Sequence, residues 1–171
     1  MPFVPAEDSS EQNSPRSLYV LGGRQRKPTR GSDLEHERNL YEAAVILEVD
    51  AQDGSARVKA EHKTPPEALA TDESSVFFKA GTVVGDKMYA CTSTEVLVYD
   101  LPGFTISNYI SLPCFHDLHH VVPDSDGNLL VTSTGLDMVV KLDSDGTVVH
   151  EWNVLGEHPW QRFSRHEHPK R

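Results

Sequence analysis

The segment "HHVVPDSDGNLLVTSTGLDMVVKLDSDGTVVHEWNVL" (119–155) decides the fold, because the segment before it repeats its pattern. That earlier segment is "GTVVGDKMYACTSTEVLVYDLPGFTISNYISLP" (81–113). The matched runs come in the same order in both: Val83-Val84 with Val121-Val122, Met88-Tyr89-Ala90 with Leu129-Leu130-Val131, Thr92-Ser93-Thr94 with Thr132-Ser133-Thr134, and Val98-Tyr99-Asp100 with Lys141-Leu142-Asp143. The offset of 38 to 43 residues is the period of a four-stranded β-propeller blade.

Each unit is predicted to form four short strands. In the second unit these strands cover residues 116–122, 128–134, 137–142 and 147–154. Two of the turns between them contain Asp-Gly, which is a strong hairpin signal between β-rich runs. These are Asp126-Gly127 and Asp145-Gly146.

A weaker unit precedes these two. Residues 17–21, 42–54 and 56–64 resemble the second, third and fourth strands of a blade, with a polar loop over 22–39. Residues 34–47 are also good helix formers, so one helix is the alternative there. Strand alternation and the "DAQDG" turn favour the blade.

We therefore expect an all-β chain, a partial β-propeller of about three four-stranded antiparallel blades at 17–74, 75–113 and 114–156. The first blade lacks its innermost strand. Residues 1–16 are acidic and without periodicity, which predicts a flexible leader. Residues 157–171 are interpreted as a linker or the entry to a further blade.

Three blades do not close a ring, since propellers typically have four to eight. Open sheet edges invite pairing with other chains. Two interpretations follow. The chain is either the N-terminal part of a longer ring, or a second chain (its own copy or another protein) completes the ring.

The run "DLHHVVPDSDGNLLVTSTGLDMVVKLDSDGTVVHEW" (117–152) resembles a blade of the arylsulfotransferase-type β-propellers. It is also similar to blades of the wider NHL, SMP-30 and strictosidine-synthase-like group. The resemblance covers roughly residues 75–156 and concerns the architecture. These families include sulfotransferases, metal-dependent lactonases and binding propellers, so the resemblance implies ligand binding in the central channel without selecting one activity.

Composition narrows the choice of partners. The 171 residues carry a formal net charge of −10, which argues against a nucleic-acid-binding surface and against docking on anionic membranes. We find neither a signal-peptide core nor an apolar run of about 18 residues, so a cytoplasmic location is expected. The two cysteines, Cys91 and Cys114, lie in apolar runs and are predicted to be buried and reduced.

The stretch "CFHDLHHVV" (114–122) has the composition of a metal site. In a regular strand, however, His116 and His120 would share one face, and Asp117 and His119 the other. Residues four apart are roughly 13 Å apart along a strand. One metal ion needs nitrogen ligands at about 2.0–2.1 Å, so this stretch alone is not expected to bind one.

The internal repeat singles out two of these histidines. His119 and His120 stand where the first unit has Gly81 and Thr82, so blade packing does not require them. One of them is predicted to point into the central channel, as one ligand of a divalent metal or as one acid/base group, with other blades supplying the rest. Asp117 is predicted to orient the His119 ring if the strand bends. The alternative is that one histidine is interior and the others are exposed.

The tail 157–171 carries Arg162 and Arg165, which would suit a small anionic substrate such as a sulfate or a carboxylate. A solvated basic chain end is the alternative. Two functions therefore stay open. One is a small-ligand-binding propeller, an arylsulfotransferase-like or metal-dependent enzyme with its site in the channel. The other is a non-catalytic interaction scaffold, or a subunit completed by another chain.

Overall fold

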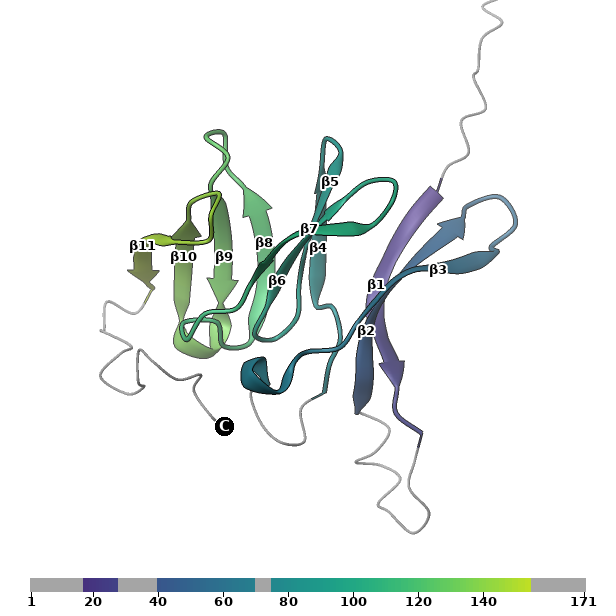
Figure 1. The fold of residues 1–171 in the computed structure, drawn as a ribbon, viewed down its shortest axis with the longest axis horizontal. Coiled ribbons are helices and arrows are strands. Elements are labelled where there is room, and N and C mark those ends of the chain that lie inside the picture. The colour runs from purple at the N-terminus through teal and green to yellow at the C-terminus, as the bar shows by residue number, and fades with distance from the viewer. Residues whose placement is uncertain (1–16, 28–39, 70–74, 155–171) are drawn as a thin grey trace, which may run out of the picture.

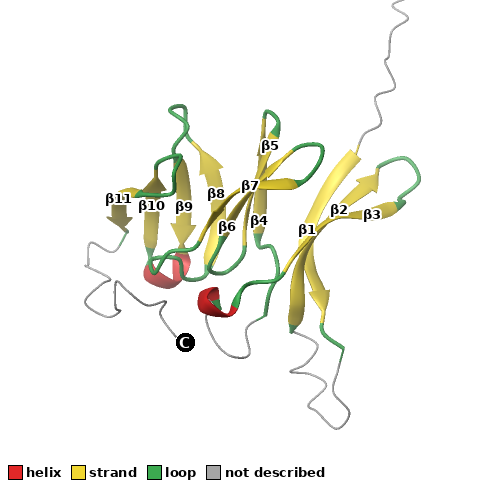
Figure 2. Ribbon diagram, viewed as in Figure 1, coloured by secondary structure: helices red, strands yellow, loops and turns green. Residues whose placement is uncertain are grey.

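Three antiparallel sheets make up the computed structural model, which describes residues 17–27, 40–69 and 75–154 (Figures 1 and 2). Blade 1 contains β1 (Ser17–Gln25), β2 (Tyr41–Asp50) and β3 (Ala56–His62). Blade 2 contains β4 (Ala80–Val84), β5 (Lys87–Cys91), β6 (Val96–Asp100) and β7 (Thr105–Ile110). Blade 3 contains β8 (Leu118–Pro123), β9 (Leu129–Ser133), β10 (Met138–Leu142) and β11 (Val148–Asn153).

Strand order follows chain order in every sheet: β1-β2-β3, β4-β5-β6-β7 and β8-β9-β10-β11. Two short 3-10 turns, η1 (Pro66–Ala68) and η2 (Thr134–Leu136), are the helical elements of the described residues (Figure 2). The chain is thus a partial β-propeller, as the repeat predicts. Residues 41–47 belong to β2, which excludes the alternative helix there, whereas 34–39 lie outside the described residues.

The two Asp-Gly turns form as predicted. Gly127 and Gly146 have φ angles of 84° and 86°, in the left-handed region that favours glycine. Asp124 Oδ1 accepts hydrogen bonds from the backbone amides of residues 126 and 128, and Asp143 Oδ1 accepts them from residues 145 and 147. Each "DSDG" therefore works as an Asx-type turn.

Two apolar cores hold the blades together, one on each face of blade 2. Between blades 1 and 2, nine buried residues pack together: Ala44, Ile46, Val76, Phe78, Met88, Ala90, Leu97, Tyr99 and Phe104. Between blades 2 and 3, the core is formed by Cys91, Val96, Ile110, Cys114, Phe115, Leu118, Val121, Leu129, Val131, Leu136, Met138, Val140 and Leu142. Blade 2 is therefore the middle layer (Figure 1).

The connection into blade 2 crosses blade 1 at Gly23. A Cβ atom there would lie 2.7 Å from Phe77 Cβ and 2.8 Å from the ring of Tyr41. Beyond the crossing, the Phe78 amide donates to the Gly22 carbonyl at 3.0 Å. Absence of a side chain at residue 23 is what lets the chain pass from β3 into β4 along this path.

The predicted regular strand over 116–122 is wrong at its start. Leu118 pairs with Ser133 and His120 with the adjacent Thr132, so His119 is an extra residue in β8. Such a β-bulge breaks the alternation of faces. Both His119 and His120 are consequently exposed, while Leu118 is fully buried.

The residues before β8 also depart from an extended strand. Asp117 has a left-handed φ of 57°, and His116 lies outside the strand and is 8% exposed. The assignment of His116 and His120 to one strand face, and of Asp117 and His119 to the other, is therefore incorrect. The bend at Asp117 and the bulge after Leu118 are the physical reasons.

Candidate functional site

Three polar side chains meet where the innermost strands of blades 2 and 3 begin. Lys79 immediately precedes β4 and forms an ion pair with Asp117, just before β8. His119 Nε2 lies 3.4 Å from Lys79 Nζ and 3.5 Å from Asp117 Oδ2. We call Lys79, Asp117 and His119 the channel cluster.

Local backbone structure holds the channel cluster in place. The left-handed turn at Asp117 directs its carbonyl oxygen to Thr134, whose hydroxyl donates to it at 2.6 Å. The Leu118 amide donates to the Ser93 carbonyl at 3.0 Å, which ties β8 to blade 2. The ladders correct the register of the repeat in the first strand of each blade: Gly81 pairs with Ala90 as Val121 pairs with Val131, so His120 corresponds to Ala80 and not to Thr82. The fold brings Lys79 and Asp117 together across neighbouring blades.

The channel cluster is a charge-compensated group with one accessible ring. The Asp117 carboxylate faces both the Lys79 ammonium and the His119 imidazole, and the His119 side chain is 56% exposed. That exposure leaves the imidazole free to meet a ligand or exchange a proton with solvent.

His120, the other histidine proposed for the channel, lies elsewhere. Its ladder partner is Thr132, so His120 shares the face of blade 3 that points away from blade 2. His116 packs instead against Gly135. A Cβ atom added to Gly135 would lie 1.7 Å from Nδ1 of His116. The fold therefore separates the three histidines of "CFHDLHHVV" completely.

The described residues contain no group of three or more histidine, cysteine, aspartate or glutamate side chains arranged to hold a metal ion. Arg162 and Arg165 lie outside the described residues. The metal and substrate roles assigned from sequence thus stay predictions.

A second polar network, which sequence reasoning missed, crosses from blade 1 to blade 2. Glu95 precedes β6 and is fully buried. His62 Nε2 donates to its carboxylate at 2.8 Å, Thr92 Oγ1 at 2.8 Å and Tyr109 Oη at 2.9 Å, and Thr64 Oγ1 donates as well. We call this the Glu95 network. Its four donors account for a carboxylate that would otherwise be costly to bury.

Electrostatics in the Glu95 network follow from burial and hydrogen bonding. Desolvation alone would raise the pKa of Glu95, but the hydrogen bonds from His62, Thr64 and Thr92 outweigh it, so the pKa is lowered from its ordinary value. Burial, together with the Glu95 charge, raises the pKa of Tyr109. Glu95 is therefore held as a carboxylate and Tyr109 as a neutral donor.

A signal for this network was present in the repeat. Glu95 stands where blade 3 has Gly135, following "TST" in both blades. Each of these positions contacts a histidine: Glu95 contacts His62, the last residue of β3, and Gly135 contacts His116, in the connection before β8. The comparison that singled out His119 would have found Glu95 too.

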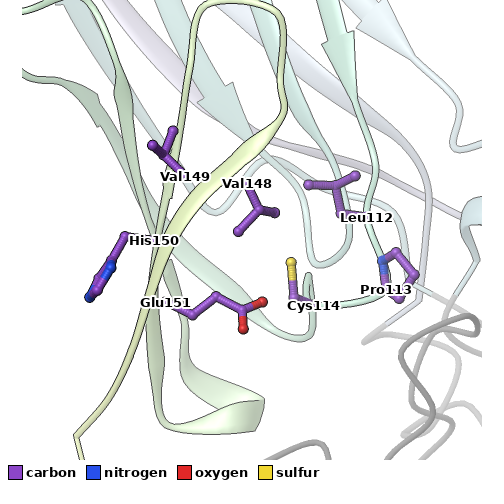
Figure 3. A pocket seen from close by; sticks show the side chains of 7 residues that line it. All are labelled: Leu112, Pro113, Cys114, Val148, Val149, His150 and Glu151. Carbon is purple, nitrogen blue, oxygen red and sulfur yellow. The ribbon is translucent and has the colours of Figure 1, made fainter.

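A shallow pocket of about 520 Å³ opens beside β11 (Figure 3). Leu112, Pro113 and Cys114 line it from the connection between blades 2 and 3, and residues 148–151 line it from β11. In Figure 3 the His150 ring and the Val149 side chain point away from the other residues that line the pocket. Neither cysteine forms a disulfide and both are buried, as predicted, and burial raises the pKa of Cys91 to about 11.

Exposed apolar side chains cover the outer faces of the two terminal blades. On blade 1, Leu18, Val20 and Val58 are 56%, 48% and 54% exposed. The ladder places Leu47 and Val49 on this same face. We call Leu18, Val20, Leu47, Val49 and Val58 the blade 1 open face.

The corresponding surface of blade 3 faces away from blade 2. Trp152 is 44% exposed and pairs with Val139 in the ladder, while Val122 pairs with Leu130 on the same side. We call Val122, Leu130, Val139 and Trp152 the blade 3 open face. Both faces continue the series of blade-to-blade surfaces beyond the described blades.

These sheets define the chain as a partial β-propeller. No protein-family model matches the sequence, and no curated protein matches it. Among solved structures, the WD40 domain of Neurospora crassa Pan2 is similar, with 18% identity and a TM-score of 0.46. The match covers 67% of this chain and 36% of that chain, so it spans about a third of that structure's length. None of the helices in the described parts of the chain is long and apolar enough to cross a membrane.

Proposed function

We propose that this chain acts as an interaction scaffold, a set of propeller blades whose terminal faces bind further blades. One observation carries the proposal: each terminal blade has apolar side chains at least partly exposed on the face that points away from blade 2, whereas blade 2 buries apolar side chains on both of its faces. Leu18, Val20 and Val58 of blade 1 are each about half exposed. Burying apolar surface contributes roughly 25 cal/mol per Å², so covering these faces would be favourable.

The incomplete first sheet supports the same proposal. Among the described residues, β1 pairs with β2 alone, although it is nine residues long. The sequence of β1 contains no proline and no charge before Arg24, features that would protect an exposed edge. No strand of the described residues pairs with the other edge of β1.

Site-specific cross-linking in cells tests the proposal. A photoreactive amino acid placed at Val20 or at Val139 reports what covers each open face, and the same probe at Val149 serves as the control. Val149 is 56% exposed and is the bulge residue of β11, so it lies opposite none of the open-face residues in the ladder. Cross-links from Val20 and Val139, with none from Val149, are expected. Absence of cross-links from both open faces would contradict the scaffold function.

A second candidate function is supported by the channel cluster. The accessible His119 ring beside Lys79 and Asp117 supports binding of a small polar ligand or a divalent metal at the channel. This reading fits an arylsulfotransferase-like or metal-dependent propeller, with Arg162 and Arg165 as further ligand contacts. Lys79 is already paired with Asp117, which weakens its attraction for an anion.

Calorimetric titration with Zn²⁺ alone and with inorganic sulfate tests this second candidate. His119→Ala is expected to abolish binding, and His120→Ala, on another face, to leave it unchanged. Equal binding by both variants, or no binding by the unsubstituted chain, would contradict it.

A further inference from the structure

We propose that the slot between β11 and the connection 112–114 binds an extended basic segment of another polypeptide, which adds to blade 3 as a fifth strand. The slot is the shallow pocket beside β11, and we call it the β11 slot. It lies where blade 3 meets the connection from blade 2, and the structure describes both blades. This binding site is therefore separate from the open faces and does not depend on what covers them.

β11 is the outermost strand of its sheet. Among the described residues its neighbour in the sheet is β10, on one side alone. Four consecutive residues of β11, 148–151, line the β11 slot, so the outer edge of the strand borders it and not just one strand face. An edge strand presents a row of backbone donors and acceptors, which is a template for pairing with another chain.

The opposite wall of the β11 slot is a turn and not a strand. The Phe115 amide donates to the Leu112 carbonyl at 2.8 Å, which closes this turn. Pro113, within the turn, has no amide hydrogen to donate. The wall therefore bounds the slot without joining the sheet. The enclosed space of about 520 Å³ lies within the range of about 300–1,000 Å³ that is usual for ligand sites.

A β-bulge at Val149 directs a carboxylate into the β11 slot. In a regular strand, residues three apart lie on opposite faces. The extra residue instead places Val148 and Glu151 on the same face. Their ladder partners, Leu142 and Val140, are both buried in the core between blades 2 and 3. Both side chains are therefore on the face of β11 that is turned toward blade 2.

The lining of the β11 slot is complementary to a basic side chain. In Figure 3, Val148 and Glu151 point across the slot toward Leu112 and Cys114. No lysine or arginine of the described residues lines it. A lysine or arginine side chain could pack its aliphatic stem on Val148 and Leu112 and bring its charged end to the Glu151 carboxylate. The formal net charge of −10 also favours the approach of a basic partner.

Strand addition gives the partner its extended form. Main-chain hydrogen bonds with the β11 edge supply affinity in this mode of recognition, and pockets for alternate side chains supply selectivity. β11 contains neither proline nor lysine, two residues that often protect edge strands. Since β11 is six residues long, the matching partner is a segment of about that length with a basic residue facing Glu151.

Fluorescence anisotropy of the full chain with a labelled peptide tests the proposal. The probe is an end-capped six-residue peptide of alternating valine and lysine, used at about 0.15 M salt so that long-range attraction is screened. Saturable binding is expected, and a matched peptide of alternating valine and glutamate should not bind. Failure of the lysine peptide to bind, or equal binding of the two peptides, would overturn the proposal.

Two variants separate the β11 slot from general attraction to an acidic protein. Glu151→Gln and Asp126→Asn each remove one negative charge, but Asp126 lies at an exposed turn between β8 and β9. Glu151→Gln should weaken binding of the lysine peptide about fivefold, and Asp126→Asn less than about twofold. Equal weakening by both would mean that the peptide follows net charge, which would overturn the proposal.

Methylation of the peptide backbone tests strand addition with the protein unchanged. In an antiparallel ladder, only alternate residues of a strand exchange hydrogen bonds with a given neighbour. Of two lysine peptides, one N-methylated at the odd positions and one at the even positions, one should lose binding and the other should keep it. Binding of both peptides, or loss of binding by both, would show that the segment does not add to β11 as a strand.

Discussion

His62 Nε2 and Glu95 Oε1 lie 2.8 Å apart across the boundary between blades 1 and 2. His62 is the last residue of β3, and Glu95 is a buried carboxylate in front of β6. Because three hydroxyl groups also donate to Glu95, one side chain joins two blades whose shared core is apolar.

Removing the Glu95 carboxylate should destabilise the chain strongly. Glu95→Ala leaves His62, Thr64, Thr92 and Tyr109 without their acceptor, and breaking a buried network of this kind costs about 3 kcal/mol. The measurement is urea-induced unfolding monitored by circular dichroism. The control Asp126→Ala, at an exposed turn residue, should change stability by about 0.5 kcal/mol or less. A similar effect of both substitutions would contradict a structural role for the network.

The same network should make the free energy of unfolding depend on pH. The pKa of Glu95 is lower in the folded chain than its ordinary value of about 4.3. Its contribution is therefore complete above that ordinary pKa and is lost as the pH falls through the folded-state pKa. Protonated glutamate resembles glutamine. The difference in unfolding free energy between the native chain and Glu95→Gln should accordingly narrow below about pH 4, and a constant difference down to pH 2 would argue against this assignment.

Adjacent glycines in β1 should respond differently to the same substitution. Gly23→Ala places a Cβ atom 2.7 Å from Phe77 Cβ, whereas nothing lies within 4 Å of a Cβ atom at Gly22. Overpacking of this kind costs about 1–3 kcal/mol. Thermal unfolding should show a clear loss for Gly23→Ala and almost none for Gly22→Ala. Equal behaviour would mean that the chain does not cross blade 1 at Gly23.

Both cysteines should resist thiol reagents in the folded chain. Cys91 is fully buried and Cys114 is 3% exposed, and desolvation raises the pKa of Cys91 to about 11. A thiolate at Cys91 is therefore almost absent at neutral pH. Colorimetric titration should detect no rapidly reacting thiol until denaturant is added, and then two. A fast-reacting thiol in the native chain would show that one of the cores is open.

How far sequence predicts this structure depends on how local the signal is. The repeat places the strands of blades 2 and 3 well, since apolar runs and Asp-Gly turns such as Asp145-Gly146 act within a few residues. The start of β8 was not predictable in this way. The left-handed conformation of Asp117 and the bulge at His119 accompany contacts with Lys79, just before β4, and with Thr134 of η2.

The contacts of Glu95 were also not predictable from local sequence pattern. The sequence contained a clue, because Glu95 replaces the glycine of the sister blade. Its partner His62, however, is 33 residues away in a different blade, and no spacing rule connects them. Strand positions therefore follow from local pattern, whereas the polar contacts between blades follow from the packing of whole sheets.

The most direct measurement is the rate at which a maleimide labels cysteine introduced on the open faces of the native assembly. Val20→Cys and Val139→Cys report the blade 1 and blade 3 open faces, and Val149→Cys gives the rate of an exposed strand residue. If further blades cover both faces, the first two positions should label at least about tenfold more slowly than the third, because a partner surface excludes the reagent. Labelling of all three positions at the same rate would contradict the claim that these faces bind further blades.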